Sequence, residues 1–177
     1  ISACLVGSEM CIRDSFWRTV VLVVEHSDEG AFGLVLNRPS ETTVGDAVPE
    51  LNDVLDAGQA LHIGGPVQPS AVVVLARFED PGDAALMAFD DVGVLAAAAA
   101  PEELAAGVRC ARAFVGHAGW GPGQLESELE REDWILEPAR REDAFTAEPE
   151  RLWSSVLARK GGRYALVARM PPDPSLN

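Results

Sequence analysis

The stretch TVVLVVEHSDEGAFGLVL, residues 19–36, decides the fold. Its first part, Thr19 to Val24, is a continuous apolar run rich in β-branched side chains, which is typical of a strand buried on both faces. Residues 27–30 supply turn chemistry, and residues 31–36 read as a second strand. We therefore predict a hairpin over residues 19–36, closed by Asn37-Arg38-Pro39 because proline ends ladder pairing.

The rest of the chain adds more strands than helices. Further strands are predicted over residues 61–63, 70–78, 86–89, 92–95, 109–115 and 164–168. Helices are predicted over residues 44–55 with a break at Pro49, from Pro101 to Gly107, from Pro122 onward, and over the amphipathic segment 149–160. Strands that come in hairpins, with helices inserted late, indicate an α+β fold rather than an alternating, doubly wound one.

Composition and charge bound the class of protein. A chain of 177 residues with 47% hydrophobic content is long enough to bury a core and short enough to be one domain. Its 28 acidic residues outnumber the 14 basic ones and give a formal net charge of −14. This charge repels phosphate backbones and disfavours direct contact with nucleic acid, although arginine clusters at residues 109–112, 140–141 and 159–163 leave a local basic patch open.

Cysteine usage and hydropathy point to the cytoplasm. The three cysteines, Cys4, Cys11 and Cys110, are odd in number and lack zinc-site spacing, which suits a reducing compartment. No apolar run reaches the roughly 18 to 20 residues that span a bilayer, and the N-terminus lacks the pattern of a signal peptide. We expect a cytoplasmic protein without membrane contact.

Residues 1–15 differ in character from the chain that follows Phe16. The string LVGSEMCIRDS resembles a translated sequencing adapter fused to a truncated reading frame, so we expect residues 1–15 to be a non-native segment. The alternative is a genuine first strand over Ala3 to Val6, followed by a loop. We predict a single domain over residues 16–170 and a disordered tail over residues 171–177.

The stretch HAGWGPGQLESELEREDW, residues 117–134, combines glycines, a proline and two tryptophans in a predicted strand, tight turn and helix. The free N–H groups of such a helix start could hold an anion, but neither a P-loop nor a Rossmann fingerprint is present. The alternative is packing, with Trp120 under the turn and Trp134 against the helix. The glutamates of this helix read as a solvated surface with an ion pair between Glu128 and Arg131.

Three segments together resemble the signature blocks of the YqgE/AlgH family, and they are FWRTVVLVVEHSDEGAFGLVLNRP (16–39), HIGGPV (62–67) and GHAGWGPGQLESELEREDWIL (116–136). They occur in the family's order, and the resemblance covers residues 16 to about 168. The family places a further strand before Phe16, where this chain departs from the pattern. The resemblance implies a small bacterial α+β fold, in which a bifurcated, mostly antiparallel β-sheet curls into a pseudo-barrel with flanking helices.

The resemblance implies little about function, because members of this family are largely uncharacterised. One branch has been named as a transcriptional regulator of exopolysaccharide synthesis, without an evident DNA-binding motif. The sequence patterns of serine hydrolases, zinc metalloproteases and calcium-binding loops are all absent. We predict no metal site and no cofactor.

Polar residues of the three blocks are the candidates for a site. Glu25 and His26 are weak candidates for general acid–base catalysis, and the three histidines, His26, His62 and His117, could converge on one rim. The residues assigned to ligand binding are Arg18, Asn37, Arg38, Gly64, Gly65, His117, Trp120 and Gln124. The alternative is structural, with an ion pair between Glu25 and Arg38 and a turn capped by Asn37.

Three functions therefore stay open. The first is a non-enzymatic cytosolic binding or regulatory protein that acts through a small ligand or a protein partner. The second is an enzyme of unknown reaction that uses Glu25 and His26. The third is a transcriptional regulator, for which direct DNA binding is disfavoured by the acidic charge.

Overall fold

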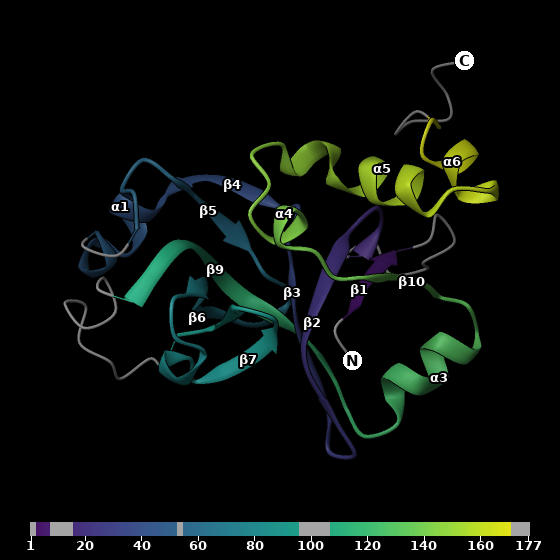
Figure 1. The fold of residues 1–177 in the computed structure, drawn as a ribbon, viewed down its shortest axis with the longest axis horizontal. Helices are drawn as coiled ribbons and strands as arrows, with labels where there is room; N and C mark the ends of the chain where they lie inside the picture. The colour runs from purple at the N-terminus through teal and green to yellow at the C-terminus, as the bar shows by residue number, and fades with distance from the viewer. Residues whose placement is uncertain (1–2, 8–15, 53–54, 96–106, 171–177) are drawn as a thin grey trace.

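The structure, a computed structural model, describes residues 3–7, 16–52, 55–95 and 107–170, and its strands form one ten-stranded sheet (Figure 1). The strands are β1 (Ala3–Gly7), β2 (Val20–Ser27), β3 (Gly30–Val35), β4 (Pro39–Thr43), β5 (Ala60–Ile63), β6 (Val67–Phe78), β7 (Leu86–Phe89), β8 (Val92–Val94), β9 (Val108–Trp120) and β10 (Trp134–Pro138). The helices are α1 (Val44–Ala47), η2 (Pro49–Leu51), η3 (Pro81–Asp83), α3 (Gln124–Glu130), α4 (Arg141–Ala144), α5 (Pro149–Lys160) and α6 (Arg163–Val167).

The predicted hairpin lies in the middle of the sheet. β2 and β3 pair antiparallel from Val21↔Val35 to Ser27↔Gly30, with a bulge between Val23 and Glu25. β1 lies on the other edge of β2, and residues 20–24 are buried, as expected for a strand with packed side chains on both faces. The hairpin predicted over residues 19–36 is confirmed.

The sheet branches at β9, and we call this branch point the fork. The first part of β9 pairs with β6 on one edge and with β5 on the other, whereas its last residues, 118–120, pair with β3. Gly64, which follows β5, joins the two branches. Its N–H donates to the Val115 carbonyl at 2.8 Å, and its own carbonyl accepts the Val35 N–H at 2.8 Å.

The sheet is open and almost entirely antiparallel. Its strand order is β10-β1-β2-β3-β9-β6-β8-β7, with β5 joined to β9 and β4 joined to β5, so the path ends at β10 and β7 without closing into a barrel. Only the pair of β5 and β9 is parallel among the described strands. The α+β class and the bifurcated, mostly antiparallel sheet with flanking helices are therefore confirmed.

Helices bury their apolar faces against three parts of the sheet. The predicted helix over residues 149–160 is confirmed as α5, which covers the region of β1 and β2 in Figure 1. Its Leu152, Trp153, Val156 and Leu157 enter the main core. A second core lies against α1 and includes Val44, and a third includes Leu125 of α3. The helix predicted over residues 44–55 is present as α1 and η2, with the break at Val48 before Pro49.

The C-terminal segment is a helix where we predicted a strand over residues 164–168. α6 follows the pair Gly161 and Gly162, which have left-handed φ values of 77° and 55°. Tyr164, Val167 and Ala168 then pack against the main core at helical spacing. A short apolar run fits either period, and packing against α5 selects the helix here.

β9 and β10 also differ from the sequence prediction. The strand predicted over residues 109–115 continues to Trp120, because Gly116 adopts a left-handed φ of 65° and the chain beyond it pairs with β3. β10 was not predicted, and it pairs with β1 from Trp134↔Gly7 to Pro138↔Ala3. Both differences depend on partner strands that are distant in the sequence.

β1 lies within the segment that we expected to be non-native. It is inserted between β2 and β10, and its residues are buried. The alternative of a genuine first strand, predicted over Ala3 to Val6, therefore matches the strand that the structure contains at Ala3–Gly7. That residues 1–15 are a non-native segment stays a prediction. Residues 8–15, the helix predicted from Pro101 and the tail predicted over residues 171–177 lie outside the described residues.

Candidate functional site

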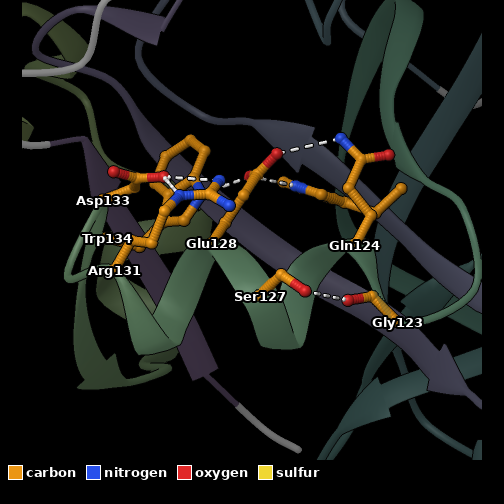
Figure 2. Close-up of polar contacts among 8 residues, drawn as sticks. Gly123, Gln124, Ser127, Glu128, Arg131, Asp133 and Trp134 are labelled. Atoms are coloured by element: carbon orange, nitrogen blue, oxygen red, sulfur yellow. Dashed lines mark hydrogen bonds and ion pairs between the residues drawn. The ribbon is translucent and has the colours of Figure 1, made fainter.

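The corner over residues 117–134 is organised by the carboxylate of Glu128 (Figure 2). One oxygen of this carboxylate accepts the indole N–H of Trp120 at 2.9 Å and that of Trp134 at 2.8 Å. The other oxygen accepts a side-chain N–H of Gln124 at 2.9 Å, and the side-chain oxygen of Gln124 accepts the Gly121 N–H at 3.1 Å. The polar atoms of Gln124 and both indole N–H groups are therefore used in hydrogen bonds within the corner.

Three aromatic rings pack together beside these hydrogen bonds. The ring of Phe16 lies 5.4 Å from that of Trp134 and 6.5 Å from that of Trp120, and the two indoles are 6.0 Å apart. Trp120 is buried, so the structure contains the packing alternative for this residue. The predicted ion pair between Glu128 and Arg131 is wrong, because Arg131 pairs with Asp133 at 2.9 Å (Figure 2).

The glycines assigned to ligand binding are required by the backbone crossing at the fork. A Cβ on Gly64 would lie 2.3 Å from the carbonyl oxygen of Gly116, and a Cβ on Gly65 would lie 2.2 Å from the carbonyl carbon of His117. Gly65 also has a φ of 152°, which L side chains rarely adopt. The ring of His117 packs on that of Phe32 at 4.9 Å. The HIGGPV block thus encodes a close approach between strands.

Arg18, Asn37 and Arg38 do lie together, around the loop that precedes β2. The side-chain oxygen of Asn37 accepts the Val20 N–H at 2.8 Å, and its side-chain N–H donates to the Arg18 carbonyl at 2.9 Å. The Arg38 guanidinium donates to the Trp17 carbonyl at 2.9 Å. The alternative that paired Arg38 with Glu25 is therefore wrong, and Asn37 ties the loop to the end of β3.

This loop and the turn after α6 form a basic, aromatic surface, which we call the Trp17 patch and define as Trp17, Arg18, Arg38, Leu166, Arg169 and Met170. The Arg18 guanidinium donates to the Met170 carbonyl at 2.9 Å and lies 5.0 Å from the ring of Trp17. Trp17 is 38% exposed, Leu166 69% and Met170 50%. Sequence reasoning identified the two arginines near β2 but missed the rest, because α6 meets this loop only in the folded chain.

Glu25 and His26, the candidates for catalysis, do not point at one another. They are consecutive in β2, opposite Phe32 and Ala31, so their side chains leave opposite faces of the sheet. The imidazole of His26 instead lies with its Nε2 2.5 Å from Glu126 Oε1 on α3. Glu25 itself is exposed. The arrangement joins the hairpin to α3 and does not assemble an acid–base pair from these two residues.

The three histidines occupy three separate environments. His26 contacts Glu126, His117 packs on Phe32, and His62 is buried on β5 with its ring 5.6 Å from that of Phe114. The expected convergence of the imidazoles on one rim is therefore not found among these contacts.

Sequence reasoning named Arg112 only as part of a possible basic surface patch, whereas Arg112 is buried on β9 near His62. Burial lowers the pKa of Arg112, and burial together with the positive charge of Arg112 lowers the pKa of His62 to about 4. A signal was present in the sequence, since Arg112 interrupts the apolar run of a buried strand. Two buried polar side chains with perturbed pKa values therefore lie where β5 meets β9, and neither of them is among the residues assigned to ligand binding.

The described residues contain no group of three or more histidine, cysteine or acidic side chains that could hold a metal ion. Burial raises the pKa of the Cys4 thiol to about 12, so Cys4 is a packed, protonated thiol. In the part of the chain that the structure describes, no helix is long and apolar enough to cross a membrane.

A branched, open, mostly antiparallel sheet that carries these three sequence blocks defines an α+β protein of the AlgH-like type. The family model described as AlgH-like matches residues 4–165, so the chain belongs to this family. The match begins within β1, the strand that sequence reasoning gave only as an alternative.

Relatives of similar length support this assignment. The chain is 38% identical to a UPF0301 protein of Thermobifida fusca over 186 residues, covering 99% of this chain and 94% of that protein. It resembles the crystal structure of protein DIP2367 from Corynebacterium diphtheriae with a TM-score of 0.84 and 31% identity, over 96% of this chain and 91% of that one. It also resembles the solution structure of AlgH from Pseudomonas aeruginosa with a TM-score of 0.74 and 28% identity, over 97% and 94% of the two chains.

Proposed function

We propose that this protein is a non-enzymatic, cytoplasmic binding protein that acts through a protein partner, and that the Trp17 patch is the surface it uses. The observation that carries the proposal is the exposed Trp17 ring beside Arg18 and Arg38, on a chain with a formal net charge of −14. Aromatic and arginine side chains together are the typical anchors of protein interfaces.

The charge pattern supports this choice of surface. Half of the twelve arginines among the described residues are in ion pairs with carboxylates of the same chain, and these are Arg77, Arg109, Arg131, Arg141, Arg151 and Arg159. Arg38 instead donates to a backbone carbonyl, and neither Arg38 nor Arg169 has an ion pair with a described carboxylate. Their positive charge is therefore available to an acidic group on a partner.

The predicted polar site gives weaker support to the other two functions. An enzyme that uses Glu25 and His26 would need the two groups near one reacting atom, and their side chains leave opposite faces of β2. A regulator that binds DNA directly would need a basic footprint larger than the three arginines of the Trp17 patch. A regulatory role through a protein contact agrees with both the geometry and the acidic charge.

The test compares three forms of the protein in capture from lysate, followed by binding measurements with the purified partner. The patch variant carries Trp17→Ala and Arg38→Gln, and the control variant carries Leu136→Ala and Arg151→Gln, which change an equally exposed apolar residue and an exposed arginine elsewhere. We expect a partner that the wild type and the control bind and that the patch variant binds at least about tenfold more weakly, since each anchor residue is worth about 1 kcal/mol or more. Equal binding by the patch variant and the control would contradict the proposal.

A further inference from the structure

A buried arginine without a counter-charge lies on β9. Arg112 is 8% exposed, and its guanidinium donates to two backbone carbonyls, those of Ala144 at 3.2 Å and Thr146 at 2.6 Å. No described carboxylate forms an ion pair with it, and its Nε has no hydrogen-bond partner. Buried charges in proteins are normally paired, so a cation in this state lacks an anion.

A buried imidazole lies beside this arginine with one nitrogen unused. His62 is 3% exposed, and its Nδ1 lies 3.1 Å from the Ala60 carbonyl, to which it must donate. Its Nε2 is buried and has no hydrogen-bond partner. A fixed Nδ1–H therefore leaves Nε2 as an empty acceptor, or as a second donor once the ring takes up a proton.

Both side chains leave the same face of the sheet. His62 is paired with Phe114 in the parallel ladder of β5 and β9, and their rings are 5.6 Å apart. Arg112 comes two residues before Phe114 on β9, so its side chain leaves the same face as that of Phe114. Two unsatisfied polar atoms, Arg112 Nε and His62 Nε2, thus lie on one face of the sheet where β5 meets β9.

We propose that His62 and Arg112 form a binding site for one small oxyanion of the carboxylate type, which is taken up together with a proton on His62. One oxygen of the anion accepts the Nε–H of Arg112, and the other accepts the Nε2–H of the imidazolium. The proton comes from solvent, so the bound state holds a guanidinium, an imidazolium and one anion. This site is separate from the Trp17 patch and does not depend on the function proposed for it.

Proton uptake at His62 is tied to the anion by the charges around the ring. The charged group that acts on the ring is Arg112, and Arg112 is in turn affected by Cys110 on the same strand. Asp143 precedes Ala144, whose carbonyl binds Arg112, and its carboxylate is held by Arg159 through two hydrogen bonds of 2.9 and 2.6 Å. Without an anion, burial and Arg112 keep the ring neutral in the physiological range. A bound anion offsets the charge of Arg112 and favours the protonated ring.

The test is an NMR titration of the full chain labelled with ¹⁵N-histidine, since there are only three histidines in the sequence. Spectra are recorded between about pH 8 and pH 3.5 in sodium formate and, at the same ionic strength, in the bulky sulfonate MES, because the pKa of His62 is lowered to about 4. His62→Gln assigns the signal of His62. Arg112→Gln tests the arginine, and Arg38→Gln is the matched control because it removes an arginine of the Trp17 patch.

We expect formate to raise the pKa of His62 by at least about one unit relative to MES, which corresponds to about a tenfold tighter binding of formate to the protonated protein. Arg38→Gln should keep this response, and Arg112→Gln should abolish it. If the wild-type protein shows the same pKa of His62 in formate and in MES, the proposal is overturned. This result needs no variant, so it holds whether or not Arg112→Gln folds. A formate response that survives in a folded Arg112→Gln protein would overturn it as well.

Discussion

One carboxylate oxygen of Glu128 accepts the indole N–H of Trp134 at 2.8 Å, and the same oxygen accepts that of Trp120 at 2.9 Å. A single acidic side chain therefore joins the end of β9, the helix α3 and the start of β10. We expect Glu128→Gln to lower the free energy of unfolding by about 3 kcal/mol, because it replaces a charged acceptor and turns an amide N–H toward Gln124.

Glu130→Gln is the matched control for that substitution, because Glu130 is exposed on the same helix. It should change stability by less than about 0.5 kcal/mol. Denaturant unfolding followed by tryptophan fluorescence measures both variants. Equal stability of the two would mean that the hydrogen bonds of Glu128 contribute nothing to the fold.

Gly65→Ala should be far more damaging than Gly123→Ala, although both residues have positive φ values, of 152° and 69°. A Cβ on Gly65 meets the backbone of His117 at 2.2 Å, whereas a Cβ on Gly123 meets nothing within 4 Å. We expect about 1 kcal/mol for Gly123→Ala, the cost of the left-handed backbone alone, and more than about 3 kcal/mol for Gly65→Ala. Denaturant unfolding measures both variants. Equal unfolding midpoints for Gly65→Ala and Gly123→Ala would show that the fork tolerates a side chain.

Acid should destabilise the fold through His62. Its pKa is lowered to about 4 in the folded protein, below the unfolded value of about 6.5, so the unfolded state takes up the proton first as the pH falls. This contribution is fully present above about pH 6.5 and is lost between there and about pH 4, up to about 3 kcal/mol. In MES buffer, unfolding of His62→Gln should depend less on pH than unfolding of the wild type, and parallel curves would count against a neutral, buried imidazole.

The ion pair between Asp143 and Arg159 should contribute more to stability than an exposed one. Asp143 is 4% exposed and accepts two hydrogen bonds from Arg159, which raises the pKa of the guanidinium. We expect Asp143→Asn to cost about 3 kcal/mol, because it leaves a partly buried cation with only the more distant carboxylate of Glu137, at 3.8 Å. Glu148→Gln breaks the exposed pair with Arg151 and should cost less than about 0.5 kcal/mol in the same thermal unfolding assay. Equal costs for the two would contradict the difference in burial.

Local sequence signals predicted the elements whose partners are close in the chain. The hairpin over residues 19–36 and the helix over residues 149–160 each carry their own period and their own ends. β10 was missed because its pairing with β1 joins opposite ends of the sequence. The run over residues 164–168 was assigned the wrong structure because its five residues do not decide between periods without α5.

For the candidate site, too, the sequence predicted which residues lie together only where those residues are close along the chain. Arg18, Asn37 and Arg38 lie close in sequence to one hairpin, and the structure brings them together. Gln124 and Trp120 were assigned to a ligand, but their polar atoms bind Glu128, which had been placed on a solvated helix face. That partnership depends on β9 continuing past Gly116 to β3, which no local pattern indicates.

The position of β1 between β2 and β10 has a consequence for synthesis. β1 and β2 can pair as soon as the chain has passed the first hairpin, but Ala3 cannot meet Pro138 until most of the protein has left the ribosome. Throughout that interval the nascent chain carries an apolar strand with one open edge, the kind of edge along which chains associate. Among the described strands, β1 is therefore the one that waits longest for its second partner.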